Sequence, residues 1–169
     1  PTTGFGPAMH LCYQAVRELL AQEELAMPFR DPVTGEILGE AAPAYHAMIK
    51  HPMDLGTVED RLESTRKTIK RGRNKPIPVG HAQPYDSAAE VVRDIVLVFN
   101  NARLFNPAGN WVHDAAVDLD ARLRRRYGSR LAAEGVPLPP AVSSGGCVVC
   151  QKNDDEANML LCDNCDSEY

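Results

Sequence analysis

The sequence predicts an all-α protein: a bundle of four helices with long connections, followed by a cysteine-rich tail. Two observations predict the bundle. Four segments repeat apolar residues with the 3.6-residue period of a helix, and alternating β-branched runs are scarce. A length of 169 residues and an apolar fraction of 44% suit one buried domain with a small appendage. The net charge of −5 gives no overall basic field of the kind that favours nucleic-acid binding.

The four helices are expected in turn along the chain. The first should cover 7–24, and the second should begin at Asp54, a residue type that caps helix N-termini. Asp86 or Ser87 should cap the third, and the fourth should begin at about Asn110. Their apolar faces are formed by Cys12, Val16, Leu19 and Leu20; Leu55, Val58 and Leu62; Ala88, Val91, Val92, Ile95, Val98, Phe99, Ala102 and Phe105; and Val112, Ala116, Leu119, Leu123 and Tyr127.

Two connections are long for a compact domain, in which most loops are short. The first follows the first helix and is rich in Pro, Gly and apolar residues, so we expect it to pack on the bundle and shape a site. The second, 64–85, carries six basic residues and no acidic one. Because Gly and Pro interrupt it, we expect a surface excursion outside the bundle, beginning where Glu63 and Ser64 end the second helix. Such a segment permits sequence-independent contact with phosphates.

Four short motifs occur in a fixed order and in a matching helical context: Pro28-Phe29, Tyr45, Pro52-Met53-Asp54-Leu55 and Asn106. Together they resemble the motifs of one family, the bromodomains. The resemblance covers about 8–131 and implies a left-handed four-helix bundle with a long first loop that binds acetylated lysine. Two positions depart from the family pattern: Met27 stands where many members have Trp, and His46 stands where a second Tyr is common.

The resemblance also assigns roles within a binding site. The Asn106 amide would donate to the acetyl carbonyl and accept from the acetamide N–H, and Tyr45 would hold a bridging water on that carbonyl. An apolar channel would accept the neutral acetylated side chain, whereas a bare ammonium would be costly to bury there. Taken alone, Asn106 could simply end a helix before Pro107, and Tyr45 could be an ordinary core residue. The expected channel residues are Pro28, Phe29, Val33, Leu38, Ala42, Phe105 and Val112.

The last part of the chain holds two Cys-x2-Cys pairs separated by eleven residues. No signal-peptide pattern opens the chain, so this spacing favours zinc over disulfides and indicates a reducing compartment. The pairs could form a ribbon around one zinc ion. The residues from Met159 to Tyr169 resemble instead the first half of a PHD finger, in which ligands interleave between two zinc ions and a histone tail adds to the sheet. The expected zinc ligands are Cys147, Cys150, Cys162 and Cys165.

These observations give an expected organisation: a bromodomain at 7–133, a linker at 134–146 and a truncated PHD-type zinc finger at 147–169. We expect a fragment of a larger nuclear chromatin regulator that binds acetylated histone tails, with nucleosomal DNA as a further candidate partner. No catalysis and no small-molecule substrate are expected, because no activated nucleophile and no phosphate-binding Gly loop is recognisable. No membrane is expected either, because the longest apolar run, 95–99, is too short to cross a bilayer. The alternative is a nucleic-acid-binding protein that uses the basic 64–85 segment and a four-cysteine zinc ribbon.

Overall fold

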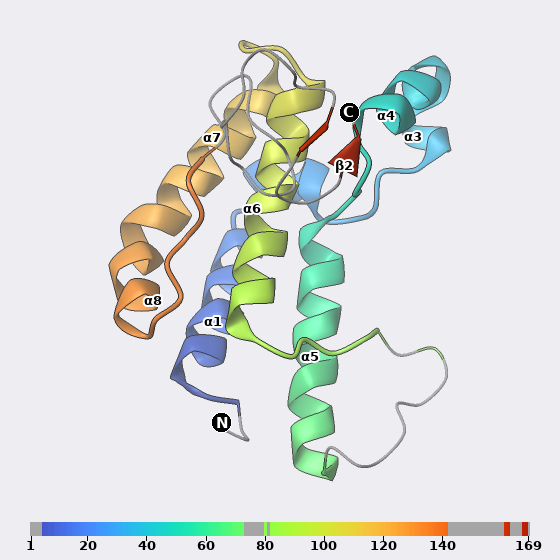
Figure 1. Cartoon of the computed structure of the whole chain (residues 1–169). Helices are drawn as coiled ribbons and strands as arrows, with labels where there is room; N and C mark the ends of the chain where they lie inside the picture. Colours follow the sequence, from blue (N-terminus) through green and yellow to red (C-terminus); the bar gives the residue numbers. More distant parts are fainter. Residues whose placement is uncertain (1–4, 73–79, 81, 142–160, 163–166, 169) are drawn as a thin grey trace.

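Four long helices form the body of the molecule in a computed structural model that describes residues 5–72, 80, 82–141, 161–162 and 167–168 (Figure 1). They are α1 (Pro7–Leu20), α5 (Leu55–Arg71), α6 (Ala88–Phe105) and α7 (Trp111–Leu123). The last continues through the π-helical turn η3 (Arg124–Gly128) into α8 (Ser129–Ala133). The predicted helix bundle is therefore confirmed. None of the helices in the described part is long and apolar enough to cross a membrane.

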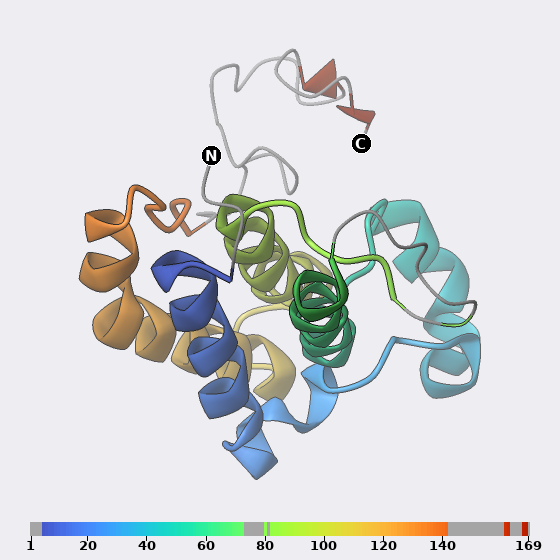
Figure 2. The same cartoon turned by 90° about the horizontal axis from the view of Figure 1, so that it is seen from below.

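The connection between α1 and α5 contains short helical segments of its own. These are α2 (Glu23–Ala26), η1 (Met27–Phe29), α3 (Gly35–Leu38), η2 (Gly39–Ala41) and α4 (Ala42–Met48). Figures 1 and 2 show α3 and α4 beside the bundle, at the end where α6 finishes. Two short strands, β1 (Leu161–Cys162) and β2 (Ser167–Glu168), pair antiparallel near the C-terminus, with Leu161 opposite Glu168.

The helix starts follow the predicted capping chemistry. The Asp54 carboxylate accepts from the Thr57 N–H at 2.7 Å, and the Ser87 hydroxyl accepts from the Glu90 N–H at 3.3 Å. At α7 the Asn110 side chain accepts from the Val112 N–H at 2.9 Å. Each cap satisfies a backbone donor that has no partner within its own helix.

Helix α6 lies at the centre of the core. Its residues are buried almost continuously from Val91 to Ala102, because α1, α5 and α7 all pack against it (Figure 2). The buried side chains of the other helices that complete this core include Cys12, Val16, Leu19, Leu55, Val58, Leu62, Ala116, Leu119 and Leu123. Close packing of this kind leaves α6 little freedom to move, so its C-terminal end is a rigid platform.

Two predicted helix ends were wrong. The first helix ends at Leu20, not at residue 24, because the backbone of Gln22 leaves helical geometry (ψ 69°) before α2 begins. The second helix does not end near Ser64 but continues to Arg71. Its basic residues are good helix formers, and Lys70 and Arg71 in the last turn suit the negative end of the helix dipole. The helix stops only at Gly72, whose positive φ of 89° favours glycine.

The basic connection is also anchored in the core at both of its ends, contrary to the predicted surface excursion. Ser64 and Thr65 are buried on α5, and Tyr85 is 2% exposed. The Tyr85 hydroxyl donates to Asp94 of α6 at 2.8 Å, and its N–H donates to the Thr65 hydroxyl at 2.7 Å. Arg61 pairs with Asp94 at 2.7 Å and stacks on the Tyr85 ring. The rest of the predicted excursion falls mostly on residues 73–79 and 81, which lie outside the described part.

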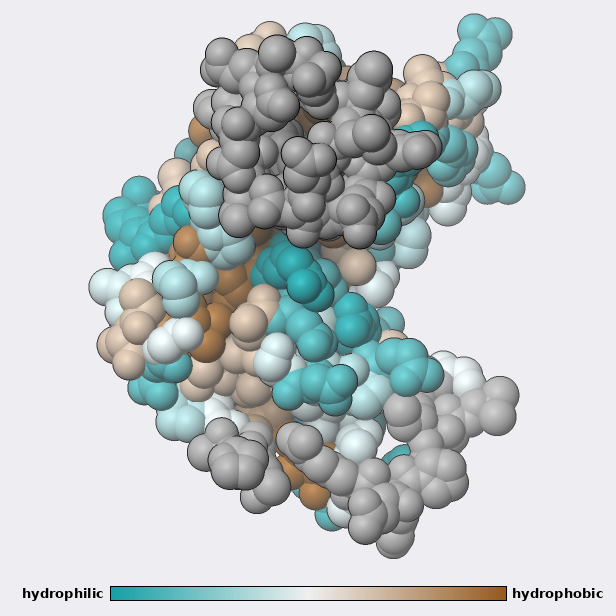
Figure 3. All heavy atoms as spheres, viewed as in Figure 1, coloured by the Kyte–Doolittle hydropathy of each residue, from teal (hydrophilic) through white to brown (hydrophobic). Residues whose placement is uncertain are grey.

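The segment after α8 turns back over the bundle. Val136 donates its N–H to the Leu131 carbonyl at 2.9 Å, and the side chains of Val136 and Leu138 pack on the core. Figure 3 shows apolar surface in the strip between α7 and α6 that this segment crosses. The start of the predicted 134–146 linker thus contributes to the core, while the domain boundary itself stays a prediction.

Candidate functional site

The end of α6 and helix α4 bring two of the predicted site residues into direct contact. The rings of Tyr45 on α4 and Phe105 on α6 meet edge to face, with centroids 5.0 Å apart and planes at 80°. Tyr45 is only 5% exposed. Burial, followed by the charge of Asp54, raises the pKa of Tyr45 above its ordinary value. Its phenol therefore stays protonated at neutral pH and can donate a hydrogen bond or accept one.

Asn106 follows Phe105 and ends helix α6. Its backbone is extended (φ −103°), and its main-chain N–H donates to the Ala102 carbonyl at 3.0 Å. Its side-chain Nδ2 donates to the same carbonyl, also at 3.0 Å. This second bond uses one of the two amide hydrogens and orients the side chain. Among the described residues the other amide N–H and the Oδ1 acceptor have no hydrogen-bond partner, and these two groups are the pair that a secondary amide ligand needs.

The side of the site formed by α7 holds Val112 and His113. Val112 is half-buried and packs against the core. His113 places Nδ1 2.8 Å from the Asn106 carbonyl oxygen. Sequence reasoning missed His113. The only signal in the sequence was a polar residue next to Val112 in the first turn of the predicted fourth helix.

The start of the first loop packs on the bundle as predicted, whereas α3 and η2 bury no residue. Phe29 is 4% exposed and meets Phe99 of α6 edge to face, with centroids 5.9 Å apart. The loop also reaches the start of α5, where the Gly56 N–H donates to the Arg30 carbonyl at 3.0 Å. A Cβ at Gly56 would lie 2.3 Å from that oxygen, so only glycine permits the approach. Met27 is 62% exposed beside this packed loop.

A buried amide holds the segment between α4 and α5. The Asn101 side chain on α6 donates to the His51 carbonyl at 2.9 Å, while Ile49 is buried one turn beyond Tyr45. Sequence reasoning assigned no role to Asn101. The sequence feature that could have predicted a role is an asparagine on the apolar face of a helix, because a buried amide needs a hydrogen-bond partner.

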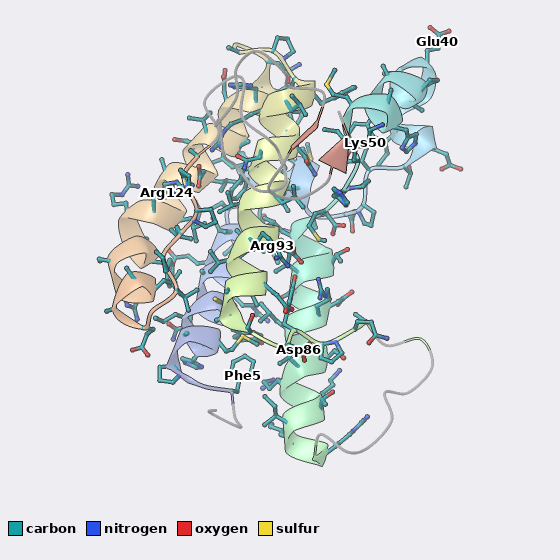
Figure 4. The ribbon with its side chains drawn as sticks, viewed as in Figure 1. Phe5, Glu40, Lys50, Asp86, Arg93 and Arg124 are labelled. Atoms are coloured by element: carbon teal, nitrogen blue, oxygen red, sulfur yellow. The ribbon has the colours of Figure 1, made fainter. Side chains whose placement is uncertain are left out.

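The remaining predicted channel residues lie on the connection between α1 and α5. Pro28, Val33, Leu38 and Ala42 are all half-buried on the first loop. Their part in a channel stays a prediction. Figure 4 shows Glu40 at the tip of this loop, pointing away from the bundle.

The side chains of Cys147, Cys150, Cys162 and Cys165 lie outside the part of the chain that the structure describes. Within the described residues, no three His, Cys, Asp or Glu side chains gather as a metal site would require. Cys12 is a buried thiol on α1, as predicted, and burial raises its pKa to about 12. The zinc ligands therefore stay a prediction.

Comparison with known proteins adds a family to this geometry. The family model described as Bromodomain matches residues 12–118. The chain is 28% identical over 137 residues to Bromodomain-containing factor 1 of Candida albicans, a match that covers 80% of this chain and 16% of that protein. It is 28% identical to the SWR1 complex bromodomain subunit bdf1 of Schizosaccharomyces pombe over 124 residues, which cover 72% of this chain and 18% of that protein.

A solved structure shares the fold. The second bromodomain of Candida albicans Bdf1, bound to an imidazopyridine, superimposes with a TM-score of 0.54 at 28% identity. The match covers 71% of this chain and 97% of that one. The two curated relatives are much longer than the region they share with this chain.

Proposed function

The chain belongs to the bromodomain family, and from this premise we propose that it binds acetylated lysine on histone tails. The observation that carries the proposal is the state of Asn106. Its side chain is fixed by the Ala102 carbonyl, yet one donor and one acceptor have no partner among the described residues. The preceding residue, Phe105, is in ring contact with Tyr45. This is the arrangement that would recognise an acetamide group.

The chemistry of the ligand explains the selectivity. Acetylation replaces an ammonium by a flat, neutral amide on an apolar stem. The second side-chain N–H of Asn106 would donate to the acetyl oxygen, and the Tyr45 hydroxyl would reach the same oxygen through a water molecule. An unmodified lysine would bring its charge against the Phe105 and Tyr45 rings. The Asp54 carboxylate, whose charge acts on Tyr45, is buried and already accepts two hydrogen bonds from Thr57, so the desolvation of the ammonium would be poorly compensated.

Calorimetry with one histone-tail peptide in acetylated and unmodified forms tests the proposal. We expect a dissociation constant in the micromolar range or weaker, about −8 kcal/mol or less favourable, because only one small group is buried. We expect no measurable binding of the unmodified form. Equal affinity for both forms would refute the acetyl-lysine role.

We also propose that the parent protein is a nuclear chromatin regulator. Support comes from the relatives, one of which is named as a subunit of the SWR1 complex. The chain spans 16% and 18% of the two relatives' lengths, so the activity of the whole protein is a proposal too. Imaging of the tagged full-length protein should place it in the nucleus; exclusion from the nucleus would contradict this setting.

For the cysteine tail we propose a PHD-type finger that binds zinc through Cys147, Cys150, Cys162 and Cys165. The support is the spacing of the four cysteines and the resemblance of Met159 to Tyr169 to a PHD finger. Because four cysteines are half of the ligand set in the PHD pattern, residues 1–169 by themselves should hold zinc substoichiometrically. Metal analysis is the test. Two tightly held zinc ions would contradict that expectation, and one would favour the four-cysteine ribbon.

A second binding function, contact with nucleosomal DNA, is favoured by one observation. Lys67, Lys70 and Arg71 are all exposed on the final turns of α5, at the opposite end of the bundle from Asn106 (Figure 1). An acetylated tail and DNA would therefore not compete for one surface. Replacing the three by Ala should weaken DNA binding and flatten its salt dependence, by a slope of roughly one per lost phosphate contact. Lys50→Ala is the control, because Lys50 lies near α4 (Figure 4). A slope that the triple variant leaves unchanged would refute the contact.

A further inference from the structure

The Asn106 carbonyl oxygen lies beyond the last hydrogen bond of α6 and needs a donor from elsewhere. Pro107 follows it and has no N–H. The donor is His113, whose Nδ1 lies 2.8 Å away. Because a carbonyl oxygen only accepts, Nδ1 must carry the hydrogen. Asn106 is thus held at three atoms: its N, its Nδ2 and its carbonyl oxygen.

The loop that brings His113 back to Asn106 is itself tightly bonded. The Asn110 N–H donates to the Pro107 carbonyl at 3.0 Å, and the Asn110 side chain caps α7. Gly109 turns the chain with a positive φ of 86° and donates to the Asp114 side chain at 3.3 Å. His113 therefore sits in the first turn of a capped helix, half-buried, and is not a mobile surface side chain.

A second tie joins the same two helix ends. Arg103, one turn before Asn106, forms an ion pair with the buried Asp120 of α7 and donates to the Asn100 side chain at 2.9 Å. The last turn of α6 is therefore held to α7 on both sides of Phe105. Because Arg103 already holds the end of α6, the His113 hydrogen bond restrains the orientation of the next peptide plane, between Asn106 and Pro107.

We propose that His113 is a positioning residue for the acetyl-lysine site, which fixes the Asn106 backbone and through it the direction of the Asn106 side-chain amide. The predicted effect of His113 on binding rests on the proposed function. Its predicted effect on the orientation of Asn106 does not, and can be measured in the free protein. Without the His113 donor, water can satisfy the half-buried carbonyl, but the Asn106 amide should sample more orientations.

Three substitutions of His113 distinguish loss of its hydrogen-bond donor from loss of side-chain volume. In His113→Asn the side-chain Nδ2 occupies about the position of the histidine Nδ1, so it can still donate to the carbonyl. In His113→Gln the amide lies one methylene farther out, nearer the place of Nε2, and His113→Ala removes the donor entirely. His10→Ala is the matched control, because His10 is exposed on α1.

The measurements are the affinity for an acetyl-lysine peptide, the melting temperature, and the NMR signals of the Asn106 side-chain amide in the free protein. We expect His113→Ala and His113→Gln to bind about five-fold more weakly, the order of effect of one hydrogen bond. Both should shift and broaden the Asn106 amide signals. His113→Asn should keep the peptide affinity and the Asn106 amide signals close to those of wild type, and His10→Ala should change neither.

Two outcomes overturn the inference. In one, His113→Gln restores binding as well as His113→Asn does. In the other, the Asn106 amide signals are unchanged in His113→Ala. If the wild-type chain binds no acetylated peptide, the proposed function fails, and the amide signals still decide the role of His113. If His113→Ala does not fold, the comparison of the Asn and Gln variants decides it.

Discussion

At the residue scale, the proposed recognition would depend on two polar side chains at the edge of an apolar contact. Asn106 is oriented by the Ala102 carbonyl, and Tyr45 is held edge to face against Phe105. Neither arrangement costs the ligand any ordering of protein side chains, because both exist in the free chain. Preorganisation of this kind lets a small group bind at all, since little of its binding energy is lost to ordering the site.

Removing only the Tyr45 hydroxyl should weaken recognition without unfolding the site. We predict that Tyr45→Phe lowers affinity for an acetylated peptide about five-fold, because the bridging water loses a partner, while stability changes by less than about 1 kcal/mol. Calorimetry and urea denaturation measure the two effects. Tyr13→Phe is the control: its hydroxyl bonds Glu63 at 2.6 Å, between α1 and α5. Equal affinity of wild type and Tyr45→Phe would show that the Tyr45 hydroxyl takes no part in binding.

At the scale of elements, the site depends on how the connections are fastened to the helices. The first loop is fixed by Phe29 in the core and by the close approach of Arg30 to Gly56. The basic connection is fixed by buried Tyr85 and Asp94 together with half-buried Arg61. Both long connections are therefore part of the packed structure, at least at these points.

The approach of the first loop to α5 predicts a strong effect at one glycine. Gly56→Ala should destabilise the fold by about 1–3 kcal/mol and weaken acetyl-lysine binding, because its Cβ would force the Arg30 backbone away. Gly35→Ala is the matched control, since a Cβ there meets no atom within 4 Å and alanine favours the helix. Urea denaturation of both variants checks this. If the two substitutions had the same effect, the loop would not be held at Gly56.

The buried charge on α6 predicts a second effect. Asp94→Asn should lower the free energy of unfolding by about 2 kcal/mol, because Arg61 and the Tyr85 hydroxyl lose their common charged acceptor. Asp86→Asn, on the exposed end before α6 (Figure 4), should stay within about 0.5 kcal/mol of wild type. Chemical denaturation compares them. If Asp94→Asn left the free energy of unfolding unchanged, the basic connection would not be anchored in the core.

At the scale of the whole molecule, buried hydroxyl and thiol groups set the response to alkali. Burial raises the pKa values of Tyr85, Tyr45 and Tyr127, and a hydrogen bond to Glu63 raises that of Tyr13. Burial also raises the pKa of the Cys12 thiol to about 12. All these groups keep their protons in the folded state at a pH where the unfolded chain would release them.

The sign of the pH dependence follows from these raised values. Stability is retained in full below the ordinary pKa values, about 8.5 for Cys and about 10 for Tyr, and falls as pH rises above them because the unfolded state then binds fewer protons. We predict a free energy of unfolding that is flat from pH 7 to about pH 8.5 and declines steadily towards pH 11. Tyr85→Phe should reduce the slope of that decline. A constant stability up to pH 11 would contradict the burial of these groups.

Local chemistry predicted the parts of the fold that depend on neighbouring residues. The caps at Asp54 and Asn110 and the apolar face of α6 could be read from residue type and period. The end of α5 was not predicted correctly. Its basic residues favour helix as well as loop, and the helix continues until Gly72.

Contacts between distant segments were beyond local chemistry. Tyr45, Phe105 and Asn106 were predicted together only through a family resemblance. The bonds of His113 to Asn106 and of Tyr85 to Asp94 depend on how loops close onto helices. Residue type alone carries no signal for such a pairing, since each partner could equally have faced water.

The central claim is that Asn106 reads the acetyl group, and one calorimetric comparison tests it most directly. Wild type, Asn106→Ala and Leu104→Ala would be titrated with the same acetylated histone peptide, Leu104 being an exposed neighbour on the last turn of α6. We predict that Asn106→Ala loses at least about ten-fold in affinity, about 1.4 kcal/mol, with its melting temperature close to that of wild type. Leu104→Ala should bind within about two-fold of wild type. Undiminished binding by a folded Asn106→Ala variant would contradict the account.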